Sequence, residues 1–262
     1  MPTIKFSRLT LASIATFSTC FMVSPALASD SPNQDEDKIG IQVGASVIAG
    51  NNAYDTDGTE IRVLPSLIYD NGKVYARGSQ IGGYVLSDDV NEVSVFLQPG
   101  GYEFDPEDAN GALKGLDERE ISGLAGVSYV RRTPIGGFRA QLATDVLDNS
   151  GGTVARLAYL ARYQNNKLTV YPSVGIEWVN DTYNDYYFGV SDEESNKTGV
   201  AKYEAKSSVS PYVNVNATYD LNSDWSLILG QNVAYLSDEQ YDSPMVKDRL
   251  TYRTMLGANY KF

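Results

Sequence analysis

The sequence predicts an all-β fold: a transmembrane antiparallel β-barrel of about 12 strands, with ten as the alternative count. Three observations carry this prediction. The chain starts with an export signal, most of the remainder alternates apolar and polar residues with period two, and the last strand ends in Phe262. Period-two alternation is the pattern of strands whose two faces meet different surroundings. No stretch after residue 28 approaches the roughly 18 apolar residues of a membrane-spanning helix.

Residues 1–28 have the layout of a secretory signal peptide. Lys5 and Arg8 form a short positive region, a mostly apolar stretch covers 9–23, and Ala-Leu-Ala at 26–28 is a small-x-small cleavage site. The apolar stretch is short and broken by Ser and Thr, which argues against a membrane anchor. We therefore predict cleavage after Ala28. The predicted division is a signal peptide at 1–28, a short N-terminal periplasmic segment at 29–38 and the barrel at 39–262.

Composition restricts the chemistry of the mature chain. The full chain has 33 acidic and 21 basic residues, a net charge of -12, no histidine and one cysteine. That cysteine, Cys20, leaves with the signal peptide, and so do two positive charges, which makes the mature charge -14. Disulfides, thiol catalysis, catalytic triads with a His base and His-bearing zinc sites are therefore excluded. The negative charge also excludes a general nucleic-acid binder.

The first seven predicted strands show alternation with some irregularities. Each is 10 to 14 residues long, near the ~9–11 residues that a tilted strand needs to cross a bilayer. Asn71-Gly72, between the second and third strands, is a strong signal for a tight hairpin turn. These strands are predicted at 39–49, 60–70, 73–86, 91–102, 118–130, 138–147 and 153–163.

The remaining five predicted strands include the clearest alternation in the chain. Every second residue from Leu168 to Trp178 is apolar, apart from a proline, and the residues between them are mainly polar or small. The segments that follow Ser208 and Trp225 repeat this pattern, with a single break at Gln231. The five strands are predicted at 168–178, 185–190, 208–219, 225–236 and 249–262.

A soluble β-sandwich would also alternate, but three features favour a membrane barrel. The strands are long, and the polar face carries Ser, Asn, Thr, Gly and Arg, as a polar lumen would. The last strand alternates up to a terminal Phe262, which resembles the C-terminal strand of bacterial outer-membrane proteins. Aromatic residues at strand ends fit the girdles at the two membrane surfaces. They are Tyr69, Trp178, Tyr219, Trp225 and Tyr235.

An even strand count places both termini in the periplasm and assigns each connection to one side. Residues 71–72 and 221–224 become short periplasmic turns, and 50–59, 191–207 and 237–248 become long outer loops. One segment breaks this rule, because the long acidic stretch at 103–117 falls on the periplasmic side. Either the count is wrong by one hairpin, which would leave ten strands, or this loop has a purpose in the periplasm.

Several short segments resemble the MipA/OmpV family of outer-membrane proteins. The resemblance spans most of the mature chain, and Tyr-Phe-Gly-Val at 187–190 is its most specific part. The segments are Pro172-Ser173 with Trp178, Tyr183 and Tyr187-Phe188-Gly189-Val190; Tyr54 with Arg62-x-x-Pro65; Tyr69-x-Asn71-Gly72; Asp242-Ser243-Pro244; and Gly257-x-x-Tyr260-x-Phe262.

The resemblance implies a barrel in the Gram-negative outer membrane that contacts lipid and lipopolysaccharide. The family's named member is a scaffold that binds a lytic transglycosylase and a bifunctional penicillin-binding protein in murein synthesis. Other members are associated with adhesion, osmotic response or antibiotic permeation. For this chain the resemblance implies a scaffold whose periplasmic segments, above all 103–117 and 179–184, contact murein enzymes. The alternatives are a porin-like small-solute channel, and a surface adhesin that acts through 191–207 and 237–248 or a stress-response barrel.

No residue of the sequence stands out as catalytic, and no cofactor or metal site is predicted. The acidic segment 55–60 looks like part of a calcium loop, but the EF-hand register would put Ala53 and Leu64 at ligand positions. Barrel enzymes usually rely on histidine, which is absent here, so we predict no enzymatic activity. Oligomeric state is not determined by the sequence.

Charged residues inside the predicted strands leave two interpretations of the lumen open. They could line a narrow pore, or they could form ion pairs that plug the interior, and the second interpretation is favoured. A barrel of ten to twelve strands lies between filled eight-stranded forms and open sixteen-stranded porins, so its size does not decide. The residues are Arg62, Arg77, Arg139, Arg156, Arg162, Arg249 and Arg253, with Asp145, Glu177 and Glu204.

Overall fold

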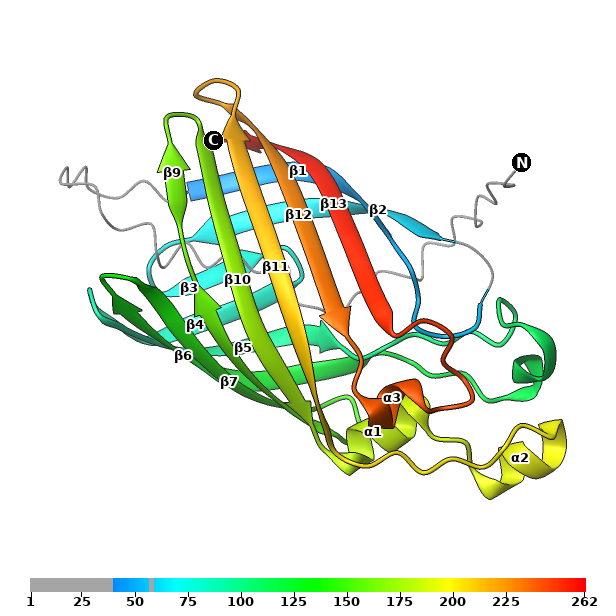
Figure 1. Cartoon of the computed structure of the whole chain (residues 1–262). Coiled ribbons are helices and arrows are strands. Elements are labelled where there is room, and N and C mark those ends of the chain that lie inside the picture. The colour runs from blue at the N-terminus through cyan, green and yellow to red at the C-terminus, as the bar shows by residue number, and fades with distance from the viewer. Residues whose placement is uncertain (1–39, 57–58) are drawn as a thin grey trace.

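The computed structural model describes residues 40–56 and 59–262 as one closed antiparallel barrel (Figure 1). Each strand pairs with the next along the chain, except that β8 pairs with β10 and not with β9, and the pairing of β13 with β1 closes the ring. The short strand β9 continues β8 along the same edge of β10, so the ring has twelve strands. The predictions made for residues 1–28 and 29–38 lie outside the described residues.

The elements follow the chain in a simple order, with helices only in the connections. No helix among the described residues is both long and apolar enough to cross a membrane. The strands are β1 (Gly40–Gly50), β2 (Glu60–Asp70), β3 (Val74–Arg77), β4 (Gln80–Ser87), β5 (Asn91–Gly100), β6 (Ser122–Thr133), β7 (Gly136–Asp145), β8 (Thr153–Leu160), β9 (Tyr163–Asn165), β10 (Leu168–Val179), β11 (Ser208–Asp220), β12 (Trp225–Tyr235) and β13 (Leu250–Lys261). The helices are α1 (Asp181–Phe188), α2 (Asp192–Thr198) and α3 (Asp238–Tyr241), with a 3-10 turn at Gly111–Gly115.

Alternation along the strands sorts side chains onto a lipid face and a lumen face. Val63 and Leu256 point outward and are 71% and 59% exposed, whereas Asn214 points inward and is 2% exposed. Trp225 packs edge-on against Tyr260 near the end of the barrel that holds the C-terminus, as an interfacial girdle does. The barrel class predicted from period-two alternation is therefore confirmed.

The predicted count of twelve is confirmed, but two errors in the individual strands cancel in it. The segment predicted as one strand at 73–86 is the hairpin β3–β4, whose two-residue turn starts at Gly78 with φ of 60°. A positive φ at the first turn position suits glycine, so Gly78-Ser79 was the signal of this hairpin. The strand predicted at 185–190 is wrong, because these residues belong mainly to helix α1.

The additional hairpin corrects the sidedness of the connections. Gly40 and Phe262 lie at the end of the barrel with the short turns, and the helices and long connections gather at the other end (Figure 1). Short turns are periplasmic in such barrels and long loops are external. Residues 101–121 and 180–207 are therefore at the outer end. The prediction that 103–117 and 179–184 are periplasmic is wrong, because it missed the turn at Gly78.

Replacing Gly78 by alanine should cost about 1 kcal/mol of unfolding free energy, because an L-residue is strained in the left-handed region. An added Cβ would meet no atom within 4 Å, so no steric clash contributes. The midpoint of urea unfolding, followed by heat-modifiable gel mobility, measures this loss. Gly83→Ala in β4 is the control, since Gly83 has no positive φ and its Cβ would make ordinary contacts. Equal midpoints for the two variants would contradict the assignment of the turn.

Candidate functional site: the loop cap over the outer mouth

Five connections close over the outer end of the barrel, and we call them the cap. By sequence they hold 20 acidic and seven basic residues, so most of the negative charge of the protein lies outside the membrane. Most of the main core of buried apolar residues also lies within or directly beneath them. The cap segments are 51–59, 101–121, 146–152, 180–207 and 236–249.

Helix α1 starts where an asparagine caps it. The side-chain oxygen of Asn180 accepts a hydrogen bond from the backbone N–H of Tyr183, at 3.1 Å, and another from Thr153 at the start of β8, at 2.9 Å. This bond satisfies one of the free N–H groups of the first turn, as N-caps do. The side chains of Tyr183 and Tyr187 are four residues apart and therefore share one helix face, which is buried. The bond from Thr153 to Asn180 thus anchors the start of α1 directly on the barrel wall.

Six aromatic rings from three cap segments pack together above the lumen. Tyr183 contacts Tyr187 edge-on at a centroid distance of 4.8 Å, and Tyr102 contacts Phe188 at 5.0 Å. Edge-on aromatic pairs contribute about 0.5–1.5 kcal/mol each beyond the area that they bury. The rings belong to Tyr54, Tyr102, Phe104, Tyr183, Tyr187 and Phe188.

Tyr187 connects this cluster to the strands below it. Its ring is fully buried and its hydroxyl lies 2.8 Å from that of Ser122 at the start of β6. Burial raises the pKa of the Tyr187 phenol above its usual value, so the hydroxyl stays neutral. Gly101 has φ of 98°, and a Cβ there would overlap the Tyr187 hydroxyl. A side chain at residue 101 would therefore displace the ring.

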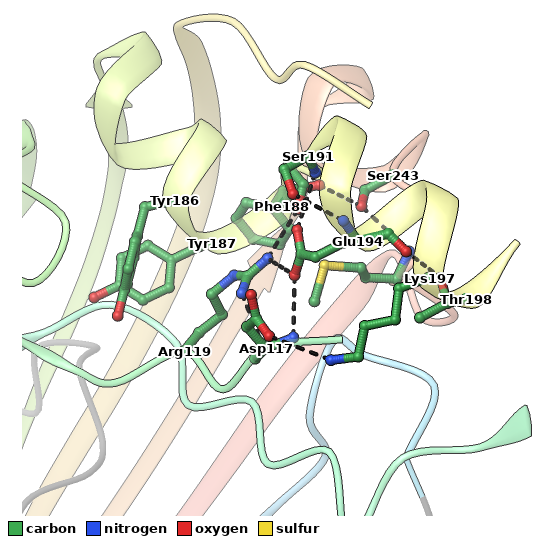
Figure 2. Close-up of polar contacts among 12 residues, drawn as sticks. Asp117, Arg119, Tyr186, Tyr187, Phe188, Ser191, Glu194, Lys197, Thr198 and Ser243 are labelled. Atoms are coloured by element: carbon green, nitrogen blue, oxygen red, sulfur yellow. Dashed lines mark hydrogen bonds and ion pairs between the residues drawn. The ribbon is translucent and has the colours of Figure 1, made fainter. Parts of the chain in front are cut away.

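A buried ion pair joins helix α2 to segment 101–121 (Figure 2). The guanidinium of Arg119 lies 2.7 Å from the carboxylate of Glu194, and both side chains are less than 10% exposed. Glu194 also accepts hydrogen bonds from the backbone N–H groups of Asp117 and Ser191, at 3.1 and 2.9 Å. The bond from Ser191 is half of a capping box, which starts α2.

These contacts set the charge of Glu194. Burial raises the pKa of its carboxyl, but the bonds from Ser191, Arg119 and Asp117 outweigh burial and hold the pKa below its ordinary value. A carboxyl with a lowered folded-state pKa stabilises the fold above its unfolded pKa and loses this contribution as pH falls through the folded pKa. The docking of α2 should therefore weaken below about pH 4.5, the ordinary value for glutamate.

A fluorophore on Asn196→Cys, an exposed position of α2, should show falling anisotropy between pH 5 and pH 3. The same label in a chain that also carries Glu194→Gln should show a smaller fall in anisotropy over this pH range, because glutamine does not titrate. Identical titrations of the two chains would contradict the role given to this carboxylate.

A second buried network joins α1 to α3 and β11. The side chain of Asn184 donates to the Ser208 hydroxyl at 2.8 Å and accepts from the side chain of Gln240 at 3.0 Å. The hydroxyl of Ser243 donates to the backbone carbonyl of Phe188 at 2.6 Å (Figure 2). Four cap segments are thereby tied to one another by hydrogen-bonded side chains or ring contacts, which makes the cap a folded lid.

The charged residues predicted for the lumen fall into two groups. Arg62, Arg77, Arg139, Arg156 and Arg253 lie on lumen-facing positions of their strands. Arg156 contacts Glu177 at 2.5 Å, and Arg77 contacts Asp70 at 2.7 Å, which are the ion pairs that a plugged interior predicts.

The remaining charged residues predicted for the lumen lie at strand ends or in connections. Arg249 pairs with Asp238, and Glu204 pairs with Lys206, both in the cap. Asp145, at the end of β7, accepts backbone N–H bonds from the following loop. The last residue, Arg162, lies in the break between β8 and β9 at the periplasmic end.

Asp55, an acidic residue of the cap, is held by residues of two other cap segments. Asp55 receives a hydrogen bond from Asn110 and pairs with Lys247, each at 3.0 Å, and these bonds lower the pKa of its carboxyl. Within the described part of the chain, no group of three or more His, Cys, Asp or Glu side chains is arranged to hold a metal ion.

Comparison with known proteins identifies the family. The family model described as MltA-interacting protein MipA matches residues 43–262, which is nearly all of the described barrel. The chain belongs to the MipA family. The MipA family assignment agrees with the resemblance seen in the sequence.

Curated relatives of this MipA family chain support the outer-membrane location. The MltA-interacting protein of Escherichia coli K12 is 35% identical over 87% of this chain and 91% of its own length. The putative outer membrane protein YiaT of Escherichia coli O157:H7 is 29% identical over 95% of this chain and 97% of its own. Among solved structures, an outer membrane channel from Pseudomonas putida F1 matches with 11% identity and a TM-score of 0.44. The match covers 89% of this chain and 99% of the channel. The protein is an outer-membrane barrel, and its relatives are named as outer-membrane or interacting proteins.

Proposed function

We propose that this MipA family barrel is a scaffold whose periplasmic end binds a murein-cleaving lytic transglycosylase. The observation that carries the proposal is the 35% identity, over most of both chains, with a protein named for its interaction with MltA. The family resemblance seen in the sequence adds a murein-synthesising penicillin-binding protein as a second proposed partner on this end. Lipid and lipopolysaccharide are the surroundings of the barrel wall and the cap.

The short turns are the proposed place of this contact. Murein lies in the periplasm, and the connections at the periplasmic end are 71–73, 88–90, 134–135, 166–167 and 221–224. Three of these turns carry an exposed apolar residue: Val90, Ile135 and Leu221, which are 43%, 72% and 44% exposed. Exposed apolar residues on a polar rim are typical anchors of a protein–protein interface. We therefore take Val90, Ile135 and Leu221 as the docking surface.

The folded cap supports a scaffold over a small-solute channel, since the rings described above occupy the outer mouth. Planar-bilayer recording addresses the alternative directly. Folded protein should give no stepwise current, and regular current steps from folded protein would favour the channel.

The binding test uses purified components. The protein, held in detergent micelles and attached to a sensor, should bind the soluble domain of a lytic transglycosylase from the same cell. Removing residues 106–116 from the cap should leave that binding unchanged, because this segment lies at the outer end. Absence of binding by the unaltered barrel would overturn the scaffold proposal.

A further inference from the structure

The barrel wall is incomplete on one side, between β2 and β5. The intervening hairpin β3–β4 is short, and its last pairing with β2 is Arg77 opposite Ile68. Among the described residues, no strand pairs with β2 on this side from residue 61 to 66, although β1 pairs with its whole length on the other side. On β5, pairing with β4 likewise stops at Leu97. We call the resulting gap the wall window.

Contacts at its base and at its top bound the wall window. Below it, the backbone N–H of Gly78 donates to the carbonyl of Leu67, and the side chain of Gln80 bonds to that of Gln98. Above it, the side chain of Asn52 donates to the carbonyl of Glu103 at 3.1 Å. The strands are three spacings apart at the base, about 14 Å at ~4.8 Å each. The wall window therefore narrows from the hairpin toward the cap, in the outer half of the wall.

Prolines mark both vertical edges of the wall window. The carbonyl of Leu67 points to the β3 side, so Pro65, two residues away, directs its nitrogen to the same side. The carbonyl of Asn91 points to the β4 side, and Pro99 on β5 shares that parity. Proline has no N–H to donate and is confined to strand positions without a ladder partner. The sequence itself thus anticipates two unpaired edges.

The unpaired edge needs polar partners. On β2, Ile61 and Val63 direct their backbone N–H and C=O groups into the wall window, by the same parity. Unsatisfied backbone groups in hydrocarbon cost several kcal/mol each. Whatever fills the wall window in the membrane therefore offers both hydrogen-bond donors and acceptors at this height.

Several apolar side chains line the lumen behind the wall window, beside the polar Arg62 and Ser66. Leu64 and Ile68 on β2 point inward and are partly exposed, and so is Met255 on β13. Ile48 of β1 lies between them, opposite Met255 in register. Another inward-facing apolar cluster, at Val130, Ala158, Leu160 and Tyr212, is almost fully buried and serves packing. The residues behind the wall window retain surface for a ligand.

The charges at the rim limit the headgroup. Arg62 on β2 pairs with Glu103 just after β5 and lies 3.5 Å from Glu60. Arg253 on β13 also interacts electrostatically with Glu60, so two positive side chains balance two negative ones. This group does not attract a further anion, and it leaves no net positive site for a phosphate or a carboxylate. A neutral headgroup with hydroxyl groups satisfies the free N–H and C=O groups without adding charge.

We propose that the wall window is a lateral binding site for a neutral single-chain amphiphile dissolved in the outer leaflet. Its hydroxyl-bearing headgroup binds at the unpaired backbone of Ile61 and Val63, and its alkyl chain lies against Leu64, Ile68 and Met255. This site is independent of the scaffold function, because it lies in the wall at the outer half and the docking surface lies at the periplasmic turns.

Two matched cysteine variants test the proposal in liposomes, in a chain that starts at residue 29 and therefore lacks Cys20. Ser66→Cys is on the lumen face of β2 beside the wall window, and Ser173→Cys is on the lumen face of β10 behind a fully paired wall. Both serines are partly exposed and lie at similar heights above the periplasmic turns. Heat-modifiable mobility reports folding, and Leu64→Cys replaces Ser66→Cys if the latter does not fold.

Each variant is labelled with a membrane-dissolved pyrene maleimide and with a sulfonated, water-soluble maleimide. For each variant, the labelling rate with pyrene maleimide is divided by the rate with the sulfonated maleimide. This ratio should be at least about tenfold higher for Ser66→Cys than for Ser173→Cys. Monododecanoylglycerol should slow pyrene labelling of Ser66→Cys severalfold, whereas monobutanoylglycerol should not, and Ser173→Cys should be unaffected by either. Equal ratios for the two variants would show that the wall window is not open to lipid. Equal effects of the two glycerides would show that no alkyl chain binds there.

Discussion

Replacing Tyr187 by alanine is expected to cost about 3–5 kcal/mol in the stability of the docked cap, the range for large aromatic deletions in a packed core. The ring is fully buried, packs against three other tyrosines and reaches Ser122 on the barrel wall. Its removal leaves a cavity at the point where the cap segments meet. Hydrogen exchange of the amides in α1 and in 101–121 should rise by several orders of magnitude, while exchange in the strands stays slow.

Tyr187→Phe separates the ring from the hydroxyl. It keeps the aromatic packing and loses the hydrogen bonds of the buried hydroxyl to Ser122, Gly100 and Glu120, so we expect a loss of only about 1–2 kcal/mol. An alanine variant with exchange rates close to those of the phenylalanine variant would contradict the role of the ring in holding the cap closed.

Arg119→Met is expected to cost a similar 3–5 kcal/mol, because it leaves the carboxylate of Glu194 buried without its cation. Loss of the guanidinium should raise the pKa of Glu194 although the backbone bonds from Ser191 and Asp117 remain, so acidification should neutralise this unpaired carboxyl more readily. Acidification should therefore loosen α2 less in this variant than in the unaltered protein. Anisotropy of the label on α2 at pH 7 and pH 4 measures both effects.

The double variant Arg119→Met with Glu194→Gln isolates the charge. Glutamine preserves the capping box of α2, and no buried charge remains. We expect docking to return to within about 1 kcal/mol of the unaltered protein. A double variant as loose as Arg119→Met alone would show that packing by the arginine side chain, and not the unpaired carboxylate, is responsible.

The barrel itself could be predicted from the sequence because lipid and lumen impose alternation on every long strand. Residues 168–178 and 208–219 lie within one or two residues of β10 and β11 for this reason. The strand predicted at 185–190 failed because its tyrosines and phenylalanine favour strands by propensity. The burial of Tyr183, Asn184, Tyr187 and Phe188 follows a helical period instead. The sequence signal of this helix was Asn180, a residue type that favours the helix N-cap position.

Missing the turn at Gly78 had a larger consequence than the failure of a single strand. A missed hairpin places every later connection at the wrong end of the barrel, until a wrongly added strand restores the count. The segment 103–117 was therefore placed in the periplasm instead of at the outer end. The contacts of the cap could not be predicted at all, since Tyr54, Arg119 and Ser243 come from segments far apart in the sequence. Only the closure of the ring brings these segments together.

Binding of a lytic transglycosylase at the periplasmic turns is tested most directly by a matched pair of altered barrels. One carries Val90→Ser, Ile135→Ser and Leu221→Ser on the docking surface, and the other carries Tyr187→Ala in the cap. Affinity of each folded barrel for the purified enzyme is the measured quantity. The turn variant should bind at least about tenfold more weakly, with a loss of more than about 1.4 kcal/mol, and the cap variant should bind like the unaltered protein. Full binding by the turn variant, or loss confined to the cap variant, would contradict a scaffold that acts through its periplasmic end.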